Sequence, residues 1–342
     1  MTLAIILLAA GQGTRMNSKK QKILHEVGGK PMVQHVFDTA VSITPIPPIL
    51  VIAPGETGLH DLFGERAQYA IQAEQRGTGH ATMMAQPLIT GAVDQIIVTY
   101  GDMPLLQAKT LQQLAQSQAE TGAAVSMLSV MGDPASSFGR VVRDENGRIL
   151  EILEVAEARR RANATELLAI REQNAGVYCF DAAWLWSNIH NLPLREARSG
   201  QEYYLTDMIE TAVQQQLRVE AIITDDPDEC LGAGTRAEMV AVEKAFRRRA
   251  NNYWLGQGVT LVDPDTIFID PDVQIGQDTI IWPNTYLQGQ TTIGSDCVIG
   301  PNTIVRSAHL GQGCCAEQAV IENATLPDHA IIAPFTHIKG TG

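Results

Sequence analysis

Residue types that bind phosphate gather near the start of the sequence. Gly11 and Gly13 follow the apolar run from Leu3 to Leu8, whose composition is typical of a buried strand in a parallel sheet. Glycine allows a sharp turn and a close approach to a ligand, and the amides exposed in such a turn can hold an anion. Arg15 adds a planar cation that suits phosphate. The two glycines alone would be explained equally well by an ordinary turn between a strand and a helix.

Two better-known glycine motifs are excluded. A dinucleotide-binding fingerprint would require a third glycine at the position of Met16. A Walker-type loop would require glycine, lysine and then serine or threonine after four spacer residues, and the sequence contains no such run. The remaining interpretation is a phosphate-binding loop that contains arginine and is followed by Lys22.

One carboxylate stands out further along the chain. Asp102 follows an apolar run, with glycine directly before it and Pro104 two residues after it, so its position is expected to be rigid. Mg²⁺ is commonly held by one or two carboxylates together with substrate phosphates. Asp102 is therefore a candidate magnesium ligand, and the alternative is a structural aspartate in a tight turn.

Strand and helix signals alternate around these residues, which predicts parallel strands joined by right-handed crossovers. We expect a helix that begins at His80 and is capped by Thr78. The other expected elements are a helix over residues 31–40 and strands over residues 3–8, 48–52, 68–71 and 95–99. Ligands bind at the carboxyl ends of such strands, so the loops at Gly11, Gly77 and Asp102 should meet at one edge.

The next part of the chain predicts a more irregular sheet with antiparallel hairpins. The expected strands cover residues 123–130, 139–143, 149–155 and 175–180. Asp144 to Gly147 should form a hairpin turn, because Asn-Gly is a strong turn signal. Residues 202–207 should open a helix, and one long helix is expected from Arg236 to about Tyr253 as a connector to a second domain.

After Gly258 the periodicity of the sequence changes. Apolar residues recur at every sixth position, namely Ile269, Ile275, Ile281, Leu287, Ile293, Ile299 and Val305. This spacing is typical of hexapeptide β-helices, in which each repeat forms one side of a triangular coil. The register slips after Val305 and is expected to resume at Val320, Leu326, Ile332 and Ile338, with an irregular corner between.

Composition narrows the class of protein. A chain of 342 residues with 45% hydrophobic and 18% charged residues can fold into two globular domains. No apolar run approaches the roughly 18–20 residues that span a bilayer, and no basic flank marks a signal peptide, which predicts a cytoplasmic location. A net charge of −13 argues against binding to nucleic acid or its phosphate backbone. Five cysteines without a CxxC pair predict reduced thiols rather than a metal site.

The stretch from Leu8 to Arg15, continued by Lys22 to His25 and by Gly29 to Met32, resembles the signature of sugar-1-phosphate nucleotidyltransferases. Among these enzymes it resembles the uridylyltransferase half of the bacterial bifunctional N-acetylglucosamine-1-phosphate uridylyltransferase and glucosamine-1-phosphate acetyltransferase. The resemblance covers essentially the whole chain. It implies an α/β, Rossmann-like nucleotidyltransferase domain with a mixed sheet over residues 1–235. A linker helix over residues 236–257 and a short left-handed parallel β-helix of hexapeptide repeats over residues 258–342 would follow.

The resemblance also implies roles for single residues. Arg15, Lys22 and Asp102 would be catalytic, and Asp102 would bind Mg²⁺. The implied nucleotide-binding residues are Leu8, Ala9, Ala10, Gly11, Gly13, Gln72, Gly77 and Thr78. The implied sugar-binding residues are Tyr100, Gly101, Gly139, Glu154, Asn174 and Tyr204. Taken singly, Glu154 and Asn174 would be interpreted as ordinary surface residues.

The activity implied by the resemblance is Mg²⁺-dependent transfer of UMP from UTP to N-acetylglucosamine-1-phosphate, which yields UDP-N-acetylglucosamine and pyrophosphate. A homotrimer formed through the β-helix is also implied, without nucleic acid or membrane partners. One alternative is an enzyme for another sugar, such as glucose-1-phosphate, or another nucleotide, such as dTTP. A second alternative is a non-catalytic oligomeric scaffold or regulatory subunit.

Three features depart from the family pattern. Gln21 replaces the usual proline before the catalytic lysine. Gly234 stands where the family has an asparagine that binds the metal, which favours the scaffold alternative. The chain stops at Gly342, before the coils that carry the family's acetyl-CoA site, so acetyltransferase activity is not expected.

Overall fold

The computed structural model describes residues 1–11, 13–197 and 200–340. The motif residue Gln12 and the expected end of the β-helix at Gly342 lie outside the described residues. The chain divides into two compact units, and each is described by itself. The first unit comprises Met1–His25 and Met32–Arg236, while the second comprises Glu26–Pro31 and the chain from Ala237 onward. The domain limits expected at residues 235 and 257 stay predictions.

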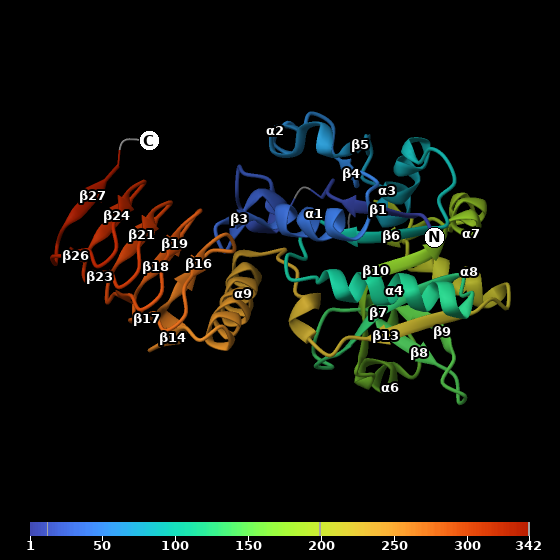
Figure 1. Ribbon diagram of the computed structural model, residues 1–342. Helices are drawn as coiled ribbons and strands as arrows, with labels where there is room; N and C mark the ends of the chain where they lie inside the picture. The colour runs from blue at the N-terminus through green and yellow to red at the C-terminus, as the bar shows by residue number, and fades with distance from the viewer. Residues whose placement is uncertain (12, 198–199, 341–342) are drawn as a thin grey trace. The chain divides into compact units, whose positions relative to one another are not determined.

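The first unit is built on a mixed sheet whose main path runs in the order β13-β7-β10-β6-β1-β4-β5 (Figure 1). Its strands are β1 (Leu3–Leu8), β4 (Ile49–Ile52), β5 (Gln68–Ile71), β6 (Gln95–Tyr100), β7 (Val125–Met131), β8 (Arg140–Arg143), β9 (Ile149–Leu153), β10 (Glu172–Asp181) and β13 (Val219–Ile223). Strand β1 is parallel to β4 and β6, whereas β10 is antiparallel to β6 and β7. The expected change from parallel to antiparallel pairing is confirmed.

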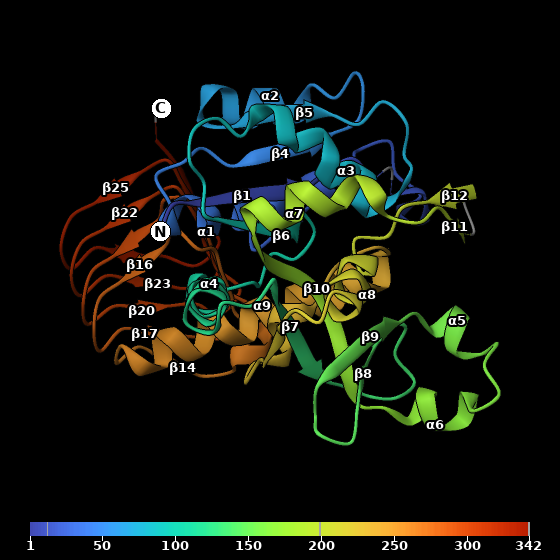
Figure 2. The ribbon, with the colours of Figure 1, turned by 90° about the vertical axis from the view of Figure 1, so that its right-hand side faces the viewer.

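Helices cover both faces of this sheet (Figure 2). Their bounds are α1 (Met32–Ile43), α2 (Gly58–Phe63), α3 (Gly77–Ala85), α4 (Ala108–Thr121), α5 (Val155–Ala158), α6 (Ala164–Ala169), α7 (Ala182–Asn188) and α8 (Asp207–Gln214). Ile5 and Leu7 of β1 pack with α1, α2 and α4, while Ile6 packs with α3, α7 and α8. Burial on both faces explains why β1 is continuously apolar.

The carboxyl ends of the parallel strands meet at one edge of the sheet. Backbone hydrogen bonds tie the loops there to neighbouring strands, since Ala9 N donates to Val51 O (2.9 Å) and Gly101 N donates to Leu8 O (3.0 Å). The first residue after β5 is held in the same way, because Gln72 N donates to Ile52 O (2.8 Å). This edge is therefore where side chains on different loops can face one ligand.

The expected start of helix α3 was wrong. The helix begins at Gly77, after an N-cap at Arg76, and Thr78 lies inside its first turn. Its first turn has tertiary partners, because Gly79 N donates to Tyr203 O (2.8 Å) and the Thr78 hydroxyl accepts from Leu205 N (3.0 Å). Pairing with the segment around Tyr203 thus takes the place of the expected threonine cap.

Two hairpins and short 3₁₀ turns complete the region before the second unit. They are η1 (Thr14–Met16), η2 (Lys22–Leu24), η3 (Gly64–Arg66), η4 (Gln86–Leu88), η5 (Ile189–Asn191), η6 (Pro227–Cys230) and the hairpin of β11 (Arg195–Ala197) with β12 (Gly200–Glu202). The Asp144 to Gly147 turn joins β8 to β9 as expected, with Gly147 N donating to Asp144 O (3.0 Å).

The second unit combines helix α9 (Arg236–Gly256) with three stacks of parallel strands (Figure 1). One stack contains β14 (Thr260–Leu261), β17 (Ile280–Ile281), β20 (Val298–Ile299), β23 (Cys315–Ala316) and β26 (Ile331–Ile332). A second contains β15 (Phe268–Ile269), β18 (Tyr286–Gln288), β21 (Ile304–Arg306), β24 (Val320–Glu322) and β27 (His337–Lys339). The third contains β16 (Gln274–Ile275), β19 (Thr292–Ile293), β22 (His309–Leu310) and β25 (Thr325–Leu326). This confirms the hexapeptide left-handed β-helix.

The register expected after Val305 was wrong at Val320. The buried position in β24 is Ile321, which is 0% exposed and pairs with Val305, whereas Val320 is only partly buried. The cause is a shorter spacing between inward residues, which falls from six residues to five between Val305 and Leu310, between Ala316 and Ile321, and between Ile321 and Leu326. Leu326 lies in the apolar interior as expected, and Ile332 and Ile338 are partly buried and pack against it.

An early hairpin also belongs to the second unit. Strands β2 (Glu26–Val27) and β3 (Lys30–Pro31) form it, and its turn is held to α9 because Gly28 N donates to the Glu243 carboxylate (2.9 Å). Lys30 forms an ion pair with Asp272 (2.8 Å). Among the described residues, no helix combines the length and the apolar character needed to cross a membrane.

The β-helix interior yields a stability prediction. We expect Ile281→Ala to lower the free energy of unfolding of the second unit by about 2–5 kcal/mol, because it deletes buried methyl groups and leaves a cavity. Ile281 is 0% exposed, while the adjacent Ile280 is only partly buried. Ile280→Ala is the matched control, and urea unfolding followed by circular dichroism is the measurement. Equal losses for the two variants would contradict the inward orientation of Ile281.

Candidate active site

Two pockets open beside the carboxyl edge of the sheet in the first unit. The smaller has a volume of about 410 Å³ and is lined by Leu8, Ala9, Ala10, Gly11, Lys22, Ile23, Gln72, Gln75, Gly77, Thr78, Ala81, Tyr100, Asp102 and Glu202. The larger has a volume of about 1120 Å³. Thr78, Tyr100 and Glu202 line both pockets, so the two are adjoining compartments of one site.

The glycine-rich loop is shaped by its approach to Lys22. Gly13 has a φ of +62°, and a Cβ at this position would lie only 2.5 Å from the Cβ of Lys22. Only glycine therefore lets the loop fold back against the lysine without strain. Gln21 reinforces this arrangement, since its side-chain amide donates to Ala9 O (3.0 Å). The loop and Lys22 are thus positioned together at one wall of the smaller pocket.

Lys22 and Asp102 form an ion pair that lines the smaller pocket. Each side chain is 18% exposed, so both charges can be reached by a ligand. Asp102 is held from behind, because Ala233 N donates to its backbone carbonyl (3.3 Å). A Cβ on Gly232 would lie 3.8 Å from Asp102 Oδ1, so the segment before Gly234 approaches this carboxylate closely.

The arrangement suits a metal ion that is held mainly by its substrate. Within the described part of the chain, no group of three or more histidine, cysteine, aspartate or glutamate side chains could hold a metal by itself. Asp102 supplies one carboxylate on the pocket wall. Mg²⁺ binds in this manner, through one or two carboxylates together with substrate phosphates.

Two glutamines organise the opposite side of the smaller pocket. Gln72 is 4% exposed, and its side-chain amide donates to Gly77 O (3.1 Å). Gln75 donates to Ala10 O (2.5 Å) and so fastens the segment after β5 to the glycine-rich loop. Sequence reasoning singled out Gln72 but missed Gln75, although Gln75 lies in the same short run and could have been considered with it.

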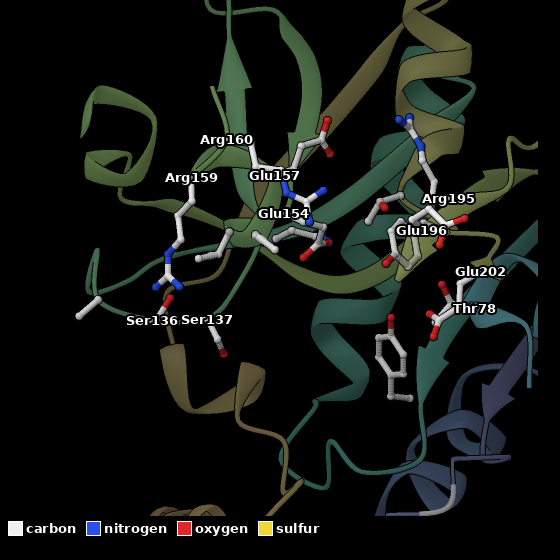
Figure 3. A pocket seen from close by; sticks show the side chains of 17 residues that line it. Thr78, Ser136, Ser137, Glu154, Glu157, Arg159, Arg160, Arg195, Glu196 and Glu202 are labelled. Atoms are coloured by element: carbon white, nitrogen blue, oxygen red, sulfur yellow. The ribbon is translucent and has the colours of Figure 1, made fainter. Parts of the chain in front are cut away.

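The larger pocket contains a carboxylate without a protein partner. Glu154 occupies the N-cap position of α5 and lines the pocket, and no described residue donates a hydrogen bond to its side chain. Burial raises the pKa of Glu154 above its ordinary value, and the nearby Glu157 and Asp207 carboxylates raise it further. Figure 3 shows Glu154 between Ser137 on one side and Thr78 on the other. A partly buried acceptor of this kind can be satisfied by hydroxyl groups of a ligand.

Asn174, Tyr204 and Tyr100 also line the larger pocket, as the sequence implied for a sugar site. The amide of Asn174 is already engaged, because it donates to the Tyr178 hydroxyl (2.6 Å) and accepts from Gly176 N (3.0 Å). Burial raises the pKa of Tyr100, and the Asp102 and Glu154 carboxylates add to this rise, so its hydroxyl remains a donor at neutral pH.

Four residues implied by the sequence do not line either pocket. Arg15 lies on η1 and is exposed, whereas Gly13 acts through its approach to Lys22. Gly101 donates its N–H to Leu8 O, so that donor is already used. Gly139 lies directly behind Glu154, where a Cβ would come within 3.4 Å of the carboxylate.

The larger pocket also contains residues that sequence reasoning did not assign. They are Ala135, Ser136, Ser137, Val155, Ala156, Glu157, Arg159, Arg160, Arg195, Glu196, Glu202 and Thr206. Glu202 and Thr206 belong to the run of residues 202–207 that the sequence had marked, so that signal was present. Arg195 forms ion pairs with Asp207 (3.0 Å) and Glu210 (3.1 Å), which fasten the β11–β12 hairpin to α8. No sequence pattern marked Arg195.

Comparison with known families places both units. A family model described as a MobA-like NTP transferase domain matches residues 5–180. A bacterial transferase hexapeptide model of six repeats matches residues 272–307. The first match contains the glycine-rich loop, Lys22, Asp102 and Glu154, and the second lies within the stacked coils.

Whole-chain relatives share both parts. Bifunctional protein GlmU from Exiguobacterium sibiricum is 40% identical over 98% of this chain and 73% of its own length. Bifunctional protein GlmU from Pelotomaculum thermopropionicum is 40% identical over 99% of this chain and 73% of its own length, and that from Enterococcus faecalis is 37% identical over 98% and 71%. The chain therefore belongs to the family of bifunctional GlmU proteins, with an NTP transferase domain followed by hexapeptide repeats.

Proposed function

We propose that the chain transfers UMP from UTP to N-acetylglucosamine-1-phosphate and releases pyrophosphate. The observation that carries the proposal is the meeting of two pockets beside the Lys22–Asp102 ion pair. One pocket has a glycine-rich loop and the other has an unpartnered carboxylate, Glu154, so one suits a nucleotide and the other a sugar. Membership of the NTP transferase and GlmU families supports the same class of reaction.

The proposed reaction is an in-line displacement at the α-phosphorus of UTP. A phosphate oxygen of the sugar-1-phosphate forms the new P–O bond, and the bond to the β-phosphate oxygen breaks to release pyrophosphate. Such transfers depend mostly on positioning and on stabilising negative charge. Lys22 meets this charge from the pocket wall, and Arg15, on the turn after Gly13, is proposed to reach the departing phosphates. When bound at Asp102, Mg²⁺ would supply additional neutralisation of the phosphates.

Each pocket contributes its own selectivity in this proposal. Leu8 to Gly11, Gln72 and Thr78 would contact the nucleoside, since all of them line the smaller pocket. Glu154 would accept hydrogen bonds from sugar hydroxyls, because a carboxylate can accept several at once. Hydrogen-bonding groups discriminate strongly, since a substrate that lacks the matching hydroxyl leaves a buried polar group unpaired.

Several expectations stay predictions. They are the homotrimer, the cytoplasmic location, the absence of acetyl transfer and the effect of Gly234 on metal binding. A non-catalytic scaffold is the second candidate function, favoured by glycine in place of the family's metal-binding asparagine. The paired Lys22 and Asp102 favour the enzyme, because a scaffold has no need of opposite charges on a pocket wall.

A substrate panel tests the proposed function directly. Purified protein is mixed with UTP or dTTP and with N-acetylglucosamine-1-phosphate or glucose-1-phosphate, and pyrophosphate release is followed with Mg²⁺ present. We expect kcat/KM to be highest for UTP with N-acetylglucosamine-1-phosphate. A higher value for glucose-1-phosphate or dTTP would favour the alternative enzymes, and no release with any pair would favour the scaffold.

Removing the pocket carboxylate should abolish metal-dependent turnover. We expect Asp102→Ala to lower kcat/KM by at least about a hundredfold, comparable to the loss of one electrostatic stabiliser. Asp61→Ala, at an exposed position of helix α2, is the control and should retain activity. Thermal unfolding of both variants checks that the fold is kept. Near-normal pyrophosphate release by folded Asp102→Ala protein would rule out its role as metal ligand.

Removing the pocket lysine should slow the chemical step. Lys22 faces phosphate charge that grows toward the transition state, so Lys22→Ala should lower kcat about as much as kcat/KM. The exposed Lys19, mutated to alanine, serves as the charge-matched control. Steady-state kinetics with UTP varied would separate the two constants. A raised KM with unchanged kcat would mean that Lys22 only anchors the ground state.

A further inference from the structure

Arg140 is a fully buried arginine at the start of β8. It is 0% exposed, and no carboxylate in the described part of the chain forms an ion pair with it. Burial lowers the pKa of Arg140 from its ordinary value, as expected for a cation removed from water. Burying a charge costs free energy unless the charged group is fully hydrogen-bonded. We therefore expect the hydrogen-bond donors of the guanidinium, and not only its volume, to be needed at this position.

All hydrogen bonds of the Arg140 side chain are donated to backbone carbonyl groups. Its Nη1 donates to Phe138 O, and its Nη2 donates to Pro134 O (2.6 Å) and Ser136 O (3.2 Å). Nε donates to Leu168 O (3.5 Å). Three alternate carbonyls of residues 134–138 therefore point inward toward one planar cation. This segment, here called the 133–139 loop, is wound around the guanidinium.

The inward carbonyls determine where the amide groups of the loop point. In a trans peptide the C=O of one residue and the N–H of the next lie on opposite sides. The N–H groups of Ala135, Ser137 and Gly139 therefore point away from Arg140. Ala135 N is occupied, because it donates to Asp133 Oδ1 (2.8 Å). Neither Ser137 N nor Gly139 N has a hydrogen-bond acceptor among the described residues.

Ser137 lies at the larger pocket, and Gly139 lies next to a carboxylate that lines it. Ala135, Ser136 and Ser137 line the pocket, and Gly139 lies against the Glu154 carboxylate. Figure 3 shows Ser136 and Ser137 at one end of the pocket, with Glu154 between them and Thr78. A second buried side chain fixes the same loop, since Gln173 donates to Asp133 O (2.7 Å) and its carbonyl bonds the Ser136 hydroxyl (2.6 Å). Two buried side chains, Arg140 and Gln173, thus hold the loop in place.

We propose that Arg140 is a positioning residue that turns two N–H groups of the loop toward the larger pocket, where they donate hydrogen bonds to oxygen atoms of the sugar. One is the Ser137 N–H, and the other belongs to Gly139, whose sugar contact the family resemblance already implies. The proposal rests on the proposed function, because it assigns these donors to the sugar-1-phosphate. Two amide donors complement the acceptor carboxylate of Glu154, so that one sugar meets both kinds of partner. Lysine cannot replace the arginine here, since it lacks the planar fork that engages several carbonyls at fixed angles.

The first experiment compares Arg140→Lys with Arg143→Lys. Arg143 lies on the same strand and pairs with Glu172 (2.7 Å) rather than with the loop, so it is the matched control. We expect Arg140→Lys to raise KM for N-acetylglucosamine-1-phosphate about tenfold, the effect of one or two lost hydrogen bonds. Both kcat and KM for UTP should change by less than about twofold. Arg143→Lys should leave all three constants near their wild-type values.

The outcomes separate positioning from a general structural role. If Arg140→Lys lowers kcat and raises both KM values together, Arg140 only stabilises the domain and the proposal fails. If its KM for the sugar-1-phosphate is unchanged, the proposal also fails. Absence of turnover by the wild-type protein would instead overturn the proposed function.

A second measurement needs no folded variant. Hydrogen exchange of the wild-type protein, followed by mass spectrometry, reports on peptides that cover residues 133–139. We expect N-acetylglucosamine-1-phosphate to slow exchange in this loop, because Ser137 N and Gly139 N would become hydrogen-bonded. Slower exchange in a peptide that contains Glu154, but not in this loop, would show that the sugar binds without these amides and would overturn the proposal.

Discussion

The site depends on how strand β1 is joined to its neighbours at their carboxyl ends. The hydrogen bond from Gly101 N to Leu8 O continues the β1–β6 pairing by one residue beyond the strand. It brings the segment that carries Asp102 beside the glycine-rich loop, and the close approach of Gly13 to Lys22 brings the opposite charge to the same place. The two charges stabilise each other in a partly exposed pocket, where a phosphate can pair with Lys22 in place of Asp102 and a cation can pair with Asp102 in place of Lys22. Few hydrogen bonds thus determine the geometry of the charged centre.

The two units obtain their stability in different ways. In the first, strands buried on both faces are covered by helices whose apolar residues lie far away in the sequence. In the second, each short strand pairs only with strands one coil earlier or later, and its apolar side chain packs on the equivalent residue of the next coil. Stability in such a stack is approximately a sum of contributions from neighbouring coils. A local defect there should therefore remain local, whereas a defect in the sheet should affect the whole unit.

The sequence alone predicted the secondary structure correctly where apolar residues follow a regular pattern. The limits of β1 and β5 were predicted to the residue, because apolar runs bounded by turn residues leave little choice. Predictions from the sequence failed where contacts with another part of the chain determine the limits or the register of an element. Helix α3 begins at Gly77 because Tyr203 accepts a hydrogen bond from its first turn, and the β-helix register moves to Ile321 because the spacing of inward residues shortens at more than one corner. In the site, Arg195 was missed for the same reason, since it acts through contacts with Asp207 and Glu210 that no local pattern records.

The hairpin from Glu26 to Pro31 limits the order in which the parts of the chain can fold during synthesis. It is synthesised near the beginning, yet Gly28 and Lys30 find their partners, Glu243 and Asp272, on segments that leave the ribosome more than two hundred residues later. During that interval the hairpin has no native surface to pair with. A single cleavage before α9 would leave the hairpin on the N-terminal fragment, separated from the rest of the second unit. Neither a protease nor an engineered truncation at that point can therefore release the second unit in complete form.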